Sequence, residues 1–121
     1  MKYNFFKNTK GQLVYAIGGA EALPETLVAL VPNTVEASGE KHMPAVTVEG
    51  SVVTVNVGSV NHPMQDAHYI EWVQLVTDRG MQRRFLKPGE APNVVFSLGD
   101  DKPLAVYAYC NLHGLWKTEL N

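Results

Sequence analysis

Hydrophobic and polar residues alternate in short runs from about residue 44 onward. Period-two alternation of this kind is typical of β-strands with one buried face. Glycine, proline and aspartate separate the runs, as expected for tight turns. The pattern predicts six strands, at about 46–49, 51–57, 69–77, 81–86, 93–98 and 103–109, and the run 115–120 is a candidate for a seventh.

Evenly spaced short strands with glycine and proline turns favour an antiparallel β-sandwich. The first part of the chain differs, because residues 1–38 alternate less and hold more glycine and alanine. We therefore expect an all-β chain, with a small N-terminal β-rich subdomain at 1–38 and the sandwich at 39–121.

The four histidines and the one cysteine fall in the connections around the predicted strands. Consecutive strands of an antiparallel sandwich reverse direction, so their connections lie alternately at its two ends. His42 precedes the first strand, His62 and His68 lie in the connection after the second, and Cys110 and His113 follow the strand 103–109. Counting the reversals places all five residues at the same end.

Each of these residues also has an ordinary structural interpretation. A single histidine is more often a hydrogen-bonded surface residue, and a single cysteine is more often a small buried apolar residue. The Cys110-x-x-His113 spacing alone also occurs in haem-attachment and zinc sites. The five residues together are stronger evidence for a metal site than any one of them, because all four histidines belong to the group and none lies in the middle of a predicted strand. Together the five residues predict a metal site.

The donor set narrows the choice of metal. Structural zinc takes four ligands, fewer than the five available. A blue-copper site takes two histidines, one cysteine and usually an axial methionine, but no methionine follows His113. Calcium and magnesium prefer oxygen ligands. Four imidazoles and one thiolate suit iron, with a sixth position open to a small ligand and a thiolate that donates electron density to it.

Composition excludes several other classes of protein. The 121 residues allow one domain with at most a small appendage, and 45% hydrophobic residues supply a core. Ten basic against twelve acidic residues give a net charge of −2, which disfavours nucleic acid and anionic membranes as partners. A secretory signal fits poorly and the single cysteine excludes an internal disulfide, so we expect a cytoplasmic protein.

Five segments, taken in order, resemble motifs of the superoxide reductases, the desulfoferrodoxin and neelaredoxin family. They are Glu-Lys-His-Met-Pro at 40–44, Val-Gly-Ser-Val-Asn-His-Pro-Met at 57–64, His-Tyr-Ile-Glu-Trp at 68–72, Phe-Leu-Lys-Pro-Gly-Glu-Ala-Pro at 85–92 and Tyr-Cys-Asn-Leu-His-Gly-Leu-Trp-Lys at 109–117. The resemblance covers nearly everything from Thr34 to Lys117, and an ordered set of this length is specific.

This resemblance implies an immunoglobulin-like β-sandwich that binds one mononuclear iron. The implied ligands are His42, His62, His68 and His113 in the equatorial plane and Cys110 on the axis. The implied activity is the one-electron reduction of superoxide to hydrogen peroxide, with the electron supplied by rubredoxin or a similar donor. A non-catalytic copper or iron electron-transfer protein on a similar sandwich is the alternative, and a plain binding module leaves the five residues unexplained.

Two residues beside the first histidine gain roles from the resemblance alone. The family places the carboxylate of the Glu40 position on oxidised iron and the ammonium of the Lys41 position near the open site. Lys41 would attract the superoxide anion and hold a water that delivers protons. Without the resemblance, an ordinary solvated pair is the better interpretation of both. The backbone N–H groups of Leu112 and His113 are further expected to donate to the Cys110 sulfur.

The N-terminal region departs from the longer members of this family, which carry four cysteines around a second iron. Lys7 and Lys10 fall near the positions of the first cysteine pair, and Ala22 and Leu23 near the second. Residues 1–38 are therefore expected to be a metal-free remnant of a desulforedoxin-like domain, with a role in packing or subunit contacts. We expect a homo-oligomer, either a dimer or a tetramer.

Overall fold

The computed structural model describes residues 4–16 and 26–120. The chain divides into two compact units, Met1–Pro32 and Asn33–Asn121, each with its own β-structure. This division falls a few residues before the position at which the sequence pattern places the domain boundary. Ala22 and Leu23, which the sequence aligns with a missing cysteine pair, lie outside the described residues.

The first unit contains a small antiparallel sheet in the strand order β2-β1-β3. Its strands are β1 (Phe5–Lys7), β2 (Leu13–Tyr15) and β3 (Val28–Ala29). Phe5 and Phe6 of the central strand are buried. Asn8 shapes the turn between β1 and β2, because its side-chain oxygen accepts hydrogen bonds from the N–H groups of Lys10 and Gln12. The unit is β-rich, as the sequence predicts.

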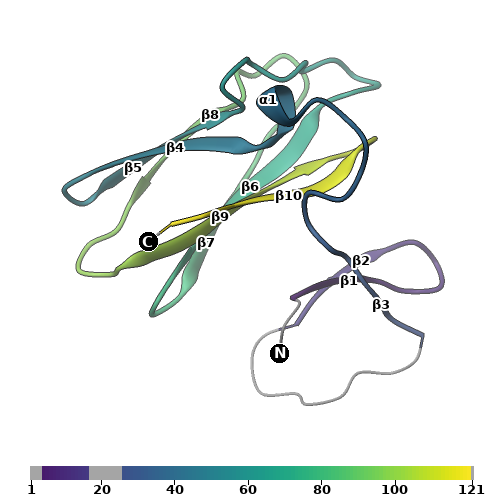
Figure 1. Cartoon of the computed structure of the whole chain (residues 1–121), viewed down its shortest axis with the longest axis horizontal. Coiled ribbons are helices and arrows are strands. Elements are labelled where there is room, and N and C mark those ends of the chain that lie inside the picture. The colour runs from purple at the N-terminus through teal and green to yellow at the C-terminus, as the bar shows by residue number, and fades with distance from the viewer. Residues whose placement is uncertain (1–3, 17–25, 121) are drawn as a thin grey trace. The chain divides into compact units, whose positions relative to one another are not determined.

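The second unit is a β-sandwich of two antiparallel sheets (Figure 1). One sheet has the strand order β4-β5-β8 and the other the order β10-β9-β6-β7. The elements of this unit are α1 (Gly39–His42), β4 (Pro44–Glu49), β5 (Val52–Val57), β6 (Ile70–Thr77), β7 (Met81–Phe85), β8 (Asn93–Ser97), β9 (Pro103–Cys110) and β10 (Gly114–Glu119).

The strand arrangement confirms the predicted all-β sandwich. Its first, second and fifth strands share one sheet and the other four form the second, which is the immunoglobulin-like arrangement. Each predicted strand is present, and the C-terminal candidate forms β10. The single turn of α1 was not predicted, because four residues are too few to show a helical period. Within the described part of the chain, no helix has both the length and the hydropathy needed to cross a membrane.

The core lies between the two sheets and consists of aliphatic side chains from both. Its members on the central strands β5, β6 and β9 are Val53, Val55, Val57, Ile70, Val73, Leu75, Val106, Ala108 and Cys110. Strict alternation would place Ile70 and Val73 on opposite faces of β6. The pairing register instead shifts between Ile70 and Trp72, and this β-bulge turns both residues toward the core. Because of the bulge, Ile70, two residues after His68, packs in the core together with Val73.

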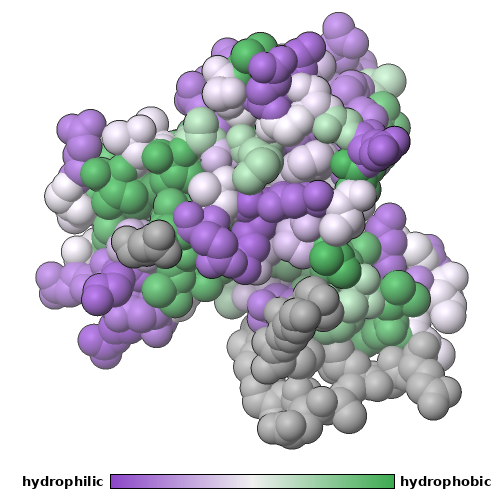
Figure 2. Space-filling view, viewed as in Figure 1, coloured by the Kyte–Doolittle hydropathy of each residue, from purple (hydrophilic) through white to green (hydrophobic). Residues whose placement is uncertain are grey.

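The two ends of the sandwich differ in character. The visible face mixes hydrophilic and hydrophobic residues, with a hydrophobic area at the end that carries the β4–β5 turn (Figure 2). Val48 and Val52, which flank that turn, are both exposed. The opposite end carries α1 and the connections that hold the predicted metal ligands (Figure 1).

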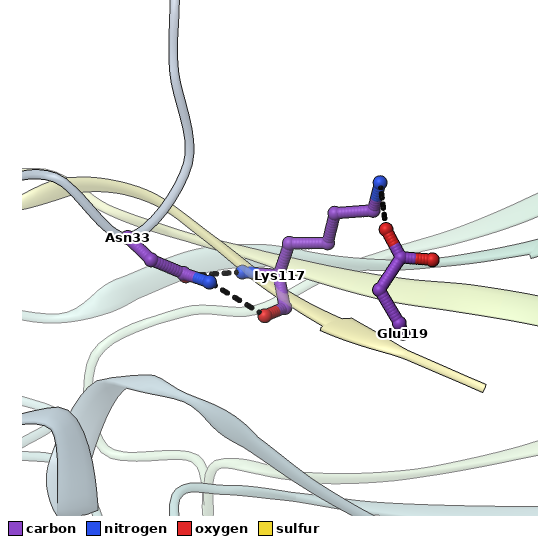
Figure 3. Close-up of polar contacts among 3 residues, drawn as sticks. All are labelled: Asn33, Lys117 and Glu119. Atoms are coloured by element: carbon purple, nitrogen blue, oxygen red, sulfur yellow. Dashed lines mark hydrogen bonds and ion pairs between the residues drawn. The ribbon is translucent and has the colours of Figure 1, made fainter.

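Asn33 covers the outer edge of β10 (Figure 3). Its side-chain amide donates to the Lys117 carbonyl at 3.0 Å and accepts from the Lys117 N–H at 2.8 Å, as a neighbouring strand would. Its backbone N–H also donates to the Leu115 carbonyl at 3.1 Å. On the same strand, Lys117 Nζ pairs with Glu119 at 2.6 Å. Because unpaired strand edges invite pairing with another chain, this contact protects the edge.

Replacing Asn33 with alanine should destabilise the second unit. The substitution removes both side-chain hydrogen bonds and places alanine at a φ of +64°, which asparagine tolerates better. We expect a loss of about 2 kcal/mol in the free energy of unfolding, measured by urea denaturation. Asn33→Gly should lose only about 1 kcal/mol, because glycine accepts the positive φ. An unchanged midpoint for the alanine variant would show that the edge contact is unimportant.

Candidate metal centre

The structure brings the four histidines and Cys110 into one group at the α1 end of the sandwich. His42 is the last residue of α1, His62 and His68 lie between β5 and β6, Cys110 ends β9, and His113 lies in the turn before β10. One nitrogen of each ring and the Cys110 sulfur lie within 4.8 Å of one another. His42, His62 and Cys110 are buried, whereas His68 and His113 are partly exposed. Solvent therefore approaches the group from the side of His68 and His113.

The four imidazole rings form a closed square. Neighbouring ring centroids are 4.5 Å apart for His42 and His62, 4.6 Å for His62 and His68, 5.0 Å for His68 and His113, and 4.9 Å for His113 and His42. The diagonal from His42 to His68 measures 6.3 Å. Neighbouring rings are nearly perpendicular, with interplanar angles between 76° and 85°. The rings thus surround a common centre and do not stack on each other.

The hydrogen bonds of two rings indicate that their inner nitrogens need a cation. Nδ1 of His42 donates to the Ser38 carbonyl and Nδ1 of His62 to the Pro63 carbonyl, both at 2.7 Å. In a neutral imidazole this leaves Nε2 with a lone pair. The two Nε2 atoms nevertheless face each other at 3.1 Å. Two lone pairs at this distance repel, and a metal ion between them turns the repulsion into two bonds. The residues therefore fit a bound metal.

The spacing of the ligand atoms favours right angles over a tetrahedron. Nitrogens bound to one metal at about 2.1 Å lie about 3.0 Å apart at a right angle and about 3.4 Å apart at a tetrahedral angle. His42 Nε2 lies 3.1 Å from both His62 Nε2 and His113 Nδ1. The Cys110 sulfur lies 3.5 Å from His62 Nε2 and 3.8 Å from His113 Nδ1, as the longer metal–sulfur bond requires. A closed tetrahedral zinc site fits these distances poorly.

Burial keeps the rings in the form that binds metals. It lowers the pKa of His62 to about 4 and also lowers the pKa of His42 and of His68. All three are therefore neutral at pH 7, and neutral imidazole is the ligand form. The Nε2 atom of His68 is buried and lacks a hydrogen-bond partner among the described residues. A buried ring nitrogen without a partner, on a histidine whose ligand atom lies within 4.8 Å of those of the other four residues, is a second indication of a metal site.

The chain without metal should lose stability as the pH falls below 6.5. The unfolded chain protonates His62 near pH 6.5, but the folded chain does so only near pH 4, so the unfolded state binds more protons in this interval. The stabilising contribution is complete above pH 6.5 and is lost by about pH 4, which amounts to about 3 kcal/mol for His62. Urea midpoints of chelator-treated protein between pH 7 and pH 4 measure this. His62→Gln should show a smaller decrease of the urea midpoint between pH 7 and pH 4. An equal decrease in both proteins would contradict the lowered pKa of His62.

The environment of Cys110 favours the thiol unless a cation is present. Burial raises the pKa of Cys110, whereas the backbone N–H groups of His113 and Leu112 donate to the sulfur and lower it. The charge of Glu71 raises the pKa further, and burial prevails. The two N–H donors are those expected from the sequence. A metal ion bound to the sulfur would deprotonate it, so metal binding should release one proton from Cys110.

Asn111 fixes the segment that carries His68, a role the sequence did not suggest. Its side chain accepts from the Tyr69 N–H at 3.0 Å and donates to the Ala67 carbonyl at 3.1 Å. Its backbone N–H also donates to the Tyr69 carbonyl at 3.2 Å. The residues on both sides of His68 are thus tied to the residue that follows Cys110. An asparagine between two predicted ligand positions was the only available indication.

Trp116 contacts two of the four histidines. Its indole stacks on His42, with centroids 4.8 Å apart and an interplanar angle of 29°. Its Nε1–H donates to the His113 carbonyl at 3.1 Å. Trp116 pairs with Ala108 in the sheet, so the strands of the sandwich hold Trp116 in place beside the two histidines. The sequence placed Trp116 in a family motif but assigned it no role.

Gly58 packs closely against the backbone of α1 and Met43. A Cβ atom at Gly58 would lie 2.6 Å from the Glu40 carbonyl oxygen, 2.7 Å from the Met43 carbonyl oxygen and 3.1 Å from the Lys41 carbonyl carbon. All three atoms belong to the backbone and cannot rotate away. The Glu40 carbonyl also accepts from the Val60 N–H at 2.9 Å. Only glycine lets the connection approach this closely, so Gly58 sets the position of the helix that ends at His42.

The structure places Glu40 and Lys41 on α1, next to His42. Both residues are exposed, and the group of five ligand residues found among the described residues does not include the Glu40 carboxylate. The backbone of both residues lies against Gly58.

Comparison with known proteins identifies the family. The sequence profile described as desulfoferrodoxin matches residues 34–119, which is more than half of the chain. The chain belongs to the desulfoferrodoxin family. A desulfoferrodoxin homolog of Archaeoglobus fulgidus is 45% identical over 86 residues, covering 71% of this chain and 68% of that protein. The matched region contains all five residues of the candidate metal centre.

Solved structures of this family have the same fold. The superoxide reductase of Treponema pallidum superposes with a TM-score of 0.76 at 40% identity, covering 95% of this chain and 98% of that chain. The one-iron superoxide reductase of Giardia intestinalis superposes with a TM-score of 0.59 at 31% identity, covering 68% and 98%. The first of these similarities extends over nearly the whole of this desulfoferrodoxin-family chain, including most of its N-terminal unit.

Proposed function

We propose that this member of the desulfoferrodoxin family is a superoxide reductase. The observation that carries the proposal is the square of four imidazoles with a cysteine sulfur beside it, in a chain whose solved relatives are superoxide reductases. The copper electron carrier is not favoured, because a blue-copper site uses two histidines and leaves the other two without a role.

The five residues would hold one mononuclear iron, cycling between Fe²⁺ and Fe³⁺. His42, His62, His68 and His113 would each supply one ring nitrogen to the metal, and Cys110 would supply its sulfur. When bound, the iron provides one electron at a position open to superoxide. The Ser38 and Pro63 carbonyls hold the His42 and His62 rings, and Trp116 donates to the His113 carbonyl, so these contacts orient three of the four histidines.

Lys41 and Glu40 act around this position from α1. The Lys41 ammonium attracts the superoxide anion toward the centre and holds a water that supplies protons to the product. The Glu40 carboxylate would be a further ligand for the oxidised metal. Both residues sit beside a ligand, on a helix fixed by the contact with Gly58.

Each turnover consumes one superoxide, one electron and two protons and forms one hydrogen peroxide. Rubredoxin or a similar small protein is the proposed electron donor, and the cytoplasm is the proposed location. The N-terminal unit is proposed to be a metal-free remnant of a desulforedoxin-like domain, contributing contacts in a dimer or tetramer. Neither nucleic acid nor membrane is part of the proposed function.

Pulse radiolysis of the reduced iron protein tests the activity and the role of Lys41 together. Superoxide should disappear with hydrogen peroxide as the product and without the oxygen that dismutation would release. Lys41→Ile should slow the bimolecular step about tenfold and flatten its salt dependence. Lys102→Ile, a matched loss of charge at the β8–β9 turn, should change the rate less than twofold. Oxygen release or an inert reduced protein would contradict the function, and equal rates for both variants would contradict the role of Lys41.

A further inference from the structure

β7 forms a basic exposed edge of the four-stranded sheet. It is the outer strand of the order β10-β9-β6-β7, and all five of its residues are exposed. The segment 79–87 contains Arg79, Arg83, Arg84 and Lys87 and no acidic residue, although the whole chain has a net charge of −2. Phe85, within this segment, is 68% exposed. An exposed aromatic side chain among arginines is the composition of a protein-binding surface for an acidic partner.

A row of aromatic side chains runs from this edge to the strand that ends in Cys110. Phe85 pairs across the sheet with Trp72 of β6, and Trp72 pairs with Tyr109 of β9. The Trp72 and Tyr109 rings stack with centroids 5.6 Å apart and an interplanar angle of 10°. Tyr109 immediately precedes Cys110. Covalent bonds and stacked rings couple electrons better than a solvent gap does, so this row connects β7 to the Cys110 sulfur.

Arg83 joins the charged edge to the aromatic row. Its guanidinium carbon lies 4.8 Å from the centre of the Trp72 ring and 6.0 Å from that of Phe85. Its Nε donates to the Gln74 side chain at 2.7 Å, which holds the guanidinium in place. Trp72 is only 5% exposed, so a protein bound at β7 would contact Phe85 and Arg83 and reach Trp72 through them.

The edge lies apart from the elements that supply the histidines. α1, the β5–β6 connection and the β9–β10 turn carry the four rings, and β7 contributes none of the five ligand residues. The partly exposed side of the centre, at His68 and His113, belongs to these other elements. Superoxide and the electron would reach the centre along different routes.

We propose that β7 is the docking surface for an acidic one-electron donor protein, whose electron passes through Trp72 and Tyr109 to the Cys110 sulfur and the iron. The donor is oxidised by one electron and the iron is reduced from Fe³⁺ to Fe²⁺, with no proton transferred in this step. The proposal rests on the proposed function, because it requires a redox-active centre at Cys110.

Binding of oxidised rubredoxin to the iron-loaded full chain tests the surface without turnover. In hydrogen–deuterium exchange, the amides of residues 81–85 should become protected on binding. Arg83→Glu should weaken binding about fivefold at low salt, whereas the matched Lys102→Glu should change it less than twofold. Protection confined to residues 40–43, 59–68 or 110–113, or equal effects of the two substitutions, would overturn the proposal.

Reduction kinetics test the aromatic route. Trp72→Leu should slow reduction of the oxidised protein by rubredoxin at least about tenfold, whereas Trp72→Phe should retain most of the rate and controls for folding. Reduction by dithionite, a small diffusible reagent, should be similar in both variants. Equal rubredoxin rates would overturn the route. The reaction of pre-reduced protein with superoxide needs no donor. If that reaction failed, the proposed function would be contradicted. If it persisted while Trp72→Leu left the rate of reduction by rubredoxin unchanged, only this proposal would be contradicted.

Discussion

Cys110→Ser should remove the visible absorption band of the oxidised iron protein. That band arises from charge transfer between a thiolate and iron, and a serine hydroxyl in this buried position stays protonated and binds iron poorly. Since loss of a contact to a ligand already costs about 10–100-fold in metal affinity, loss of the ligand itself should cost at least about 100-fold. Absorption spectroscopy and iron titration measure the two effects.

The adjacent turn offers a matched control for this substitution. Leu112 is 60% exposed and contributes only its backbone N–H to the Cys110 sulfur, so Leu112→Ala should leave both the band and the affinity unchanged. Cys110→Ser is nearly isosteric, and circular dichroism checks that the variant remains folded. A serine variant that kept the full band would show that the colour does not come from this sulfur.

Gly58→Ala should displace α1 and with it one ligand of the centre. The new methyl group would meet three backbone atoms of residues 40–43 at 2.6–3.1 Å, and the helix must move to relieve the contact. Overpacking of this kind costs about 1–3 kcal/mol. Because His42 ends the displaced helix, iron affinity should fall as well, by at least about tenfold. Thermal unfolding and iron titration measure the two losses.

Gly39→Ala is the control for Gly58→Ala, because it adds the same methyl group to α1 itself. A Cβ at Gly39 meets nothing within 4 Å, so stability and iron binding should be close to those of the unchanged chain. Equal behaviour of the two alanine variants would show that the contact at Gly58 does not position the helix. Reduced stability with unchanged iron affinity would show that His42 adjusts independently of it.

The alternation of hydrophobic residues predicted the strands and the end of the sandwich at which the histidines meet. This worked because antiparallel strands must reverse, so the placement of His42 and Cys110 followed from counting turns. β5 also shows the period-two burial that this alternation indicates. These features depend on residues close together in the chain, for which periodicity is informative.

Features that depend on distant residues were not predicted. Nothing in the sequence pattern indicated that Asn33 would pair with Lys117, or that the bulge after Ile70 would turn Val73 toward the core. The close approach at Gly58 and the bonds of Asn111 around His68 depend on how the loops pack. A motif can include such residues, but their roles appear only when the backbone is placed in three dimensions.

X-ray absorption at the iron K-edge of the purified, reduced protein tests the metal centre most directly. We expect about one iron per chain, with four nitrogen neighbours and one sulfur neighbour in its coordination shell. A shell of oxygen and nitrogen without sulfur, or a protein purified anaerobically with one zinc and no iron, would contradict the centre built from these four histidines and Cys110.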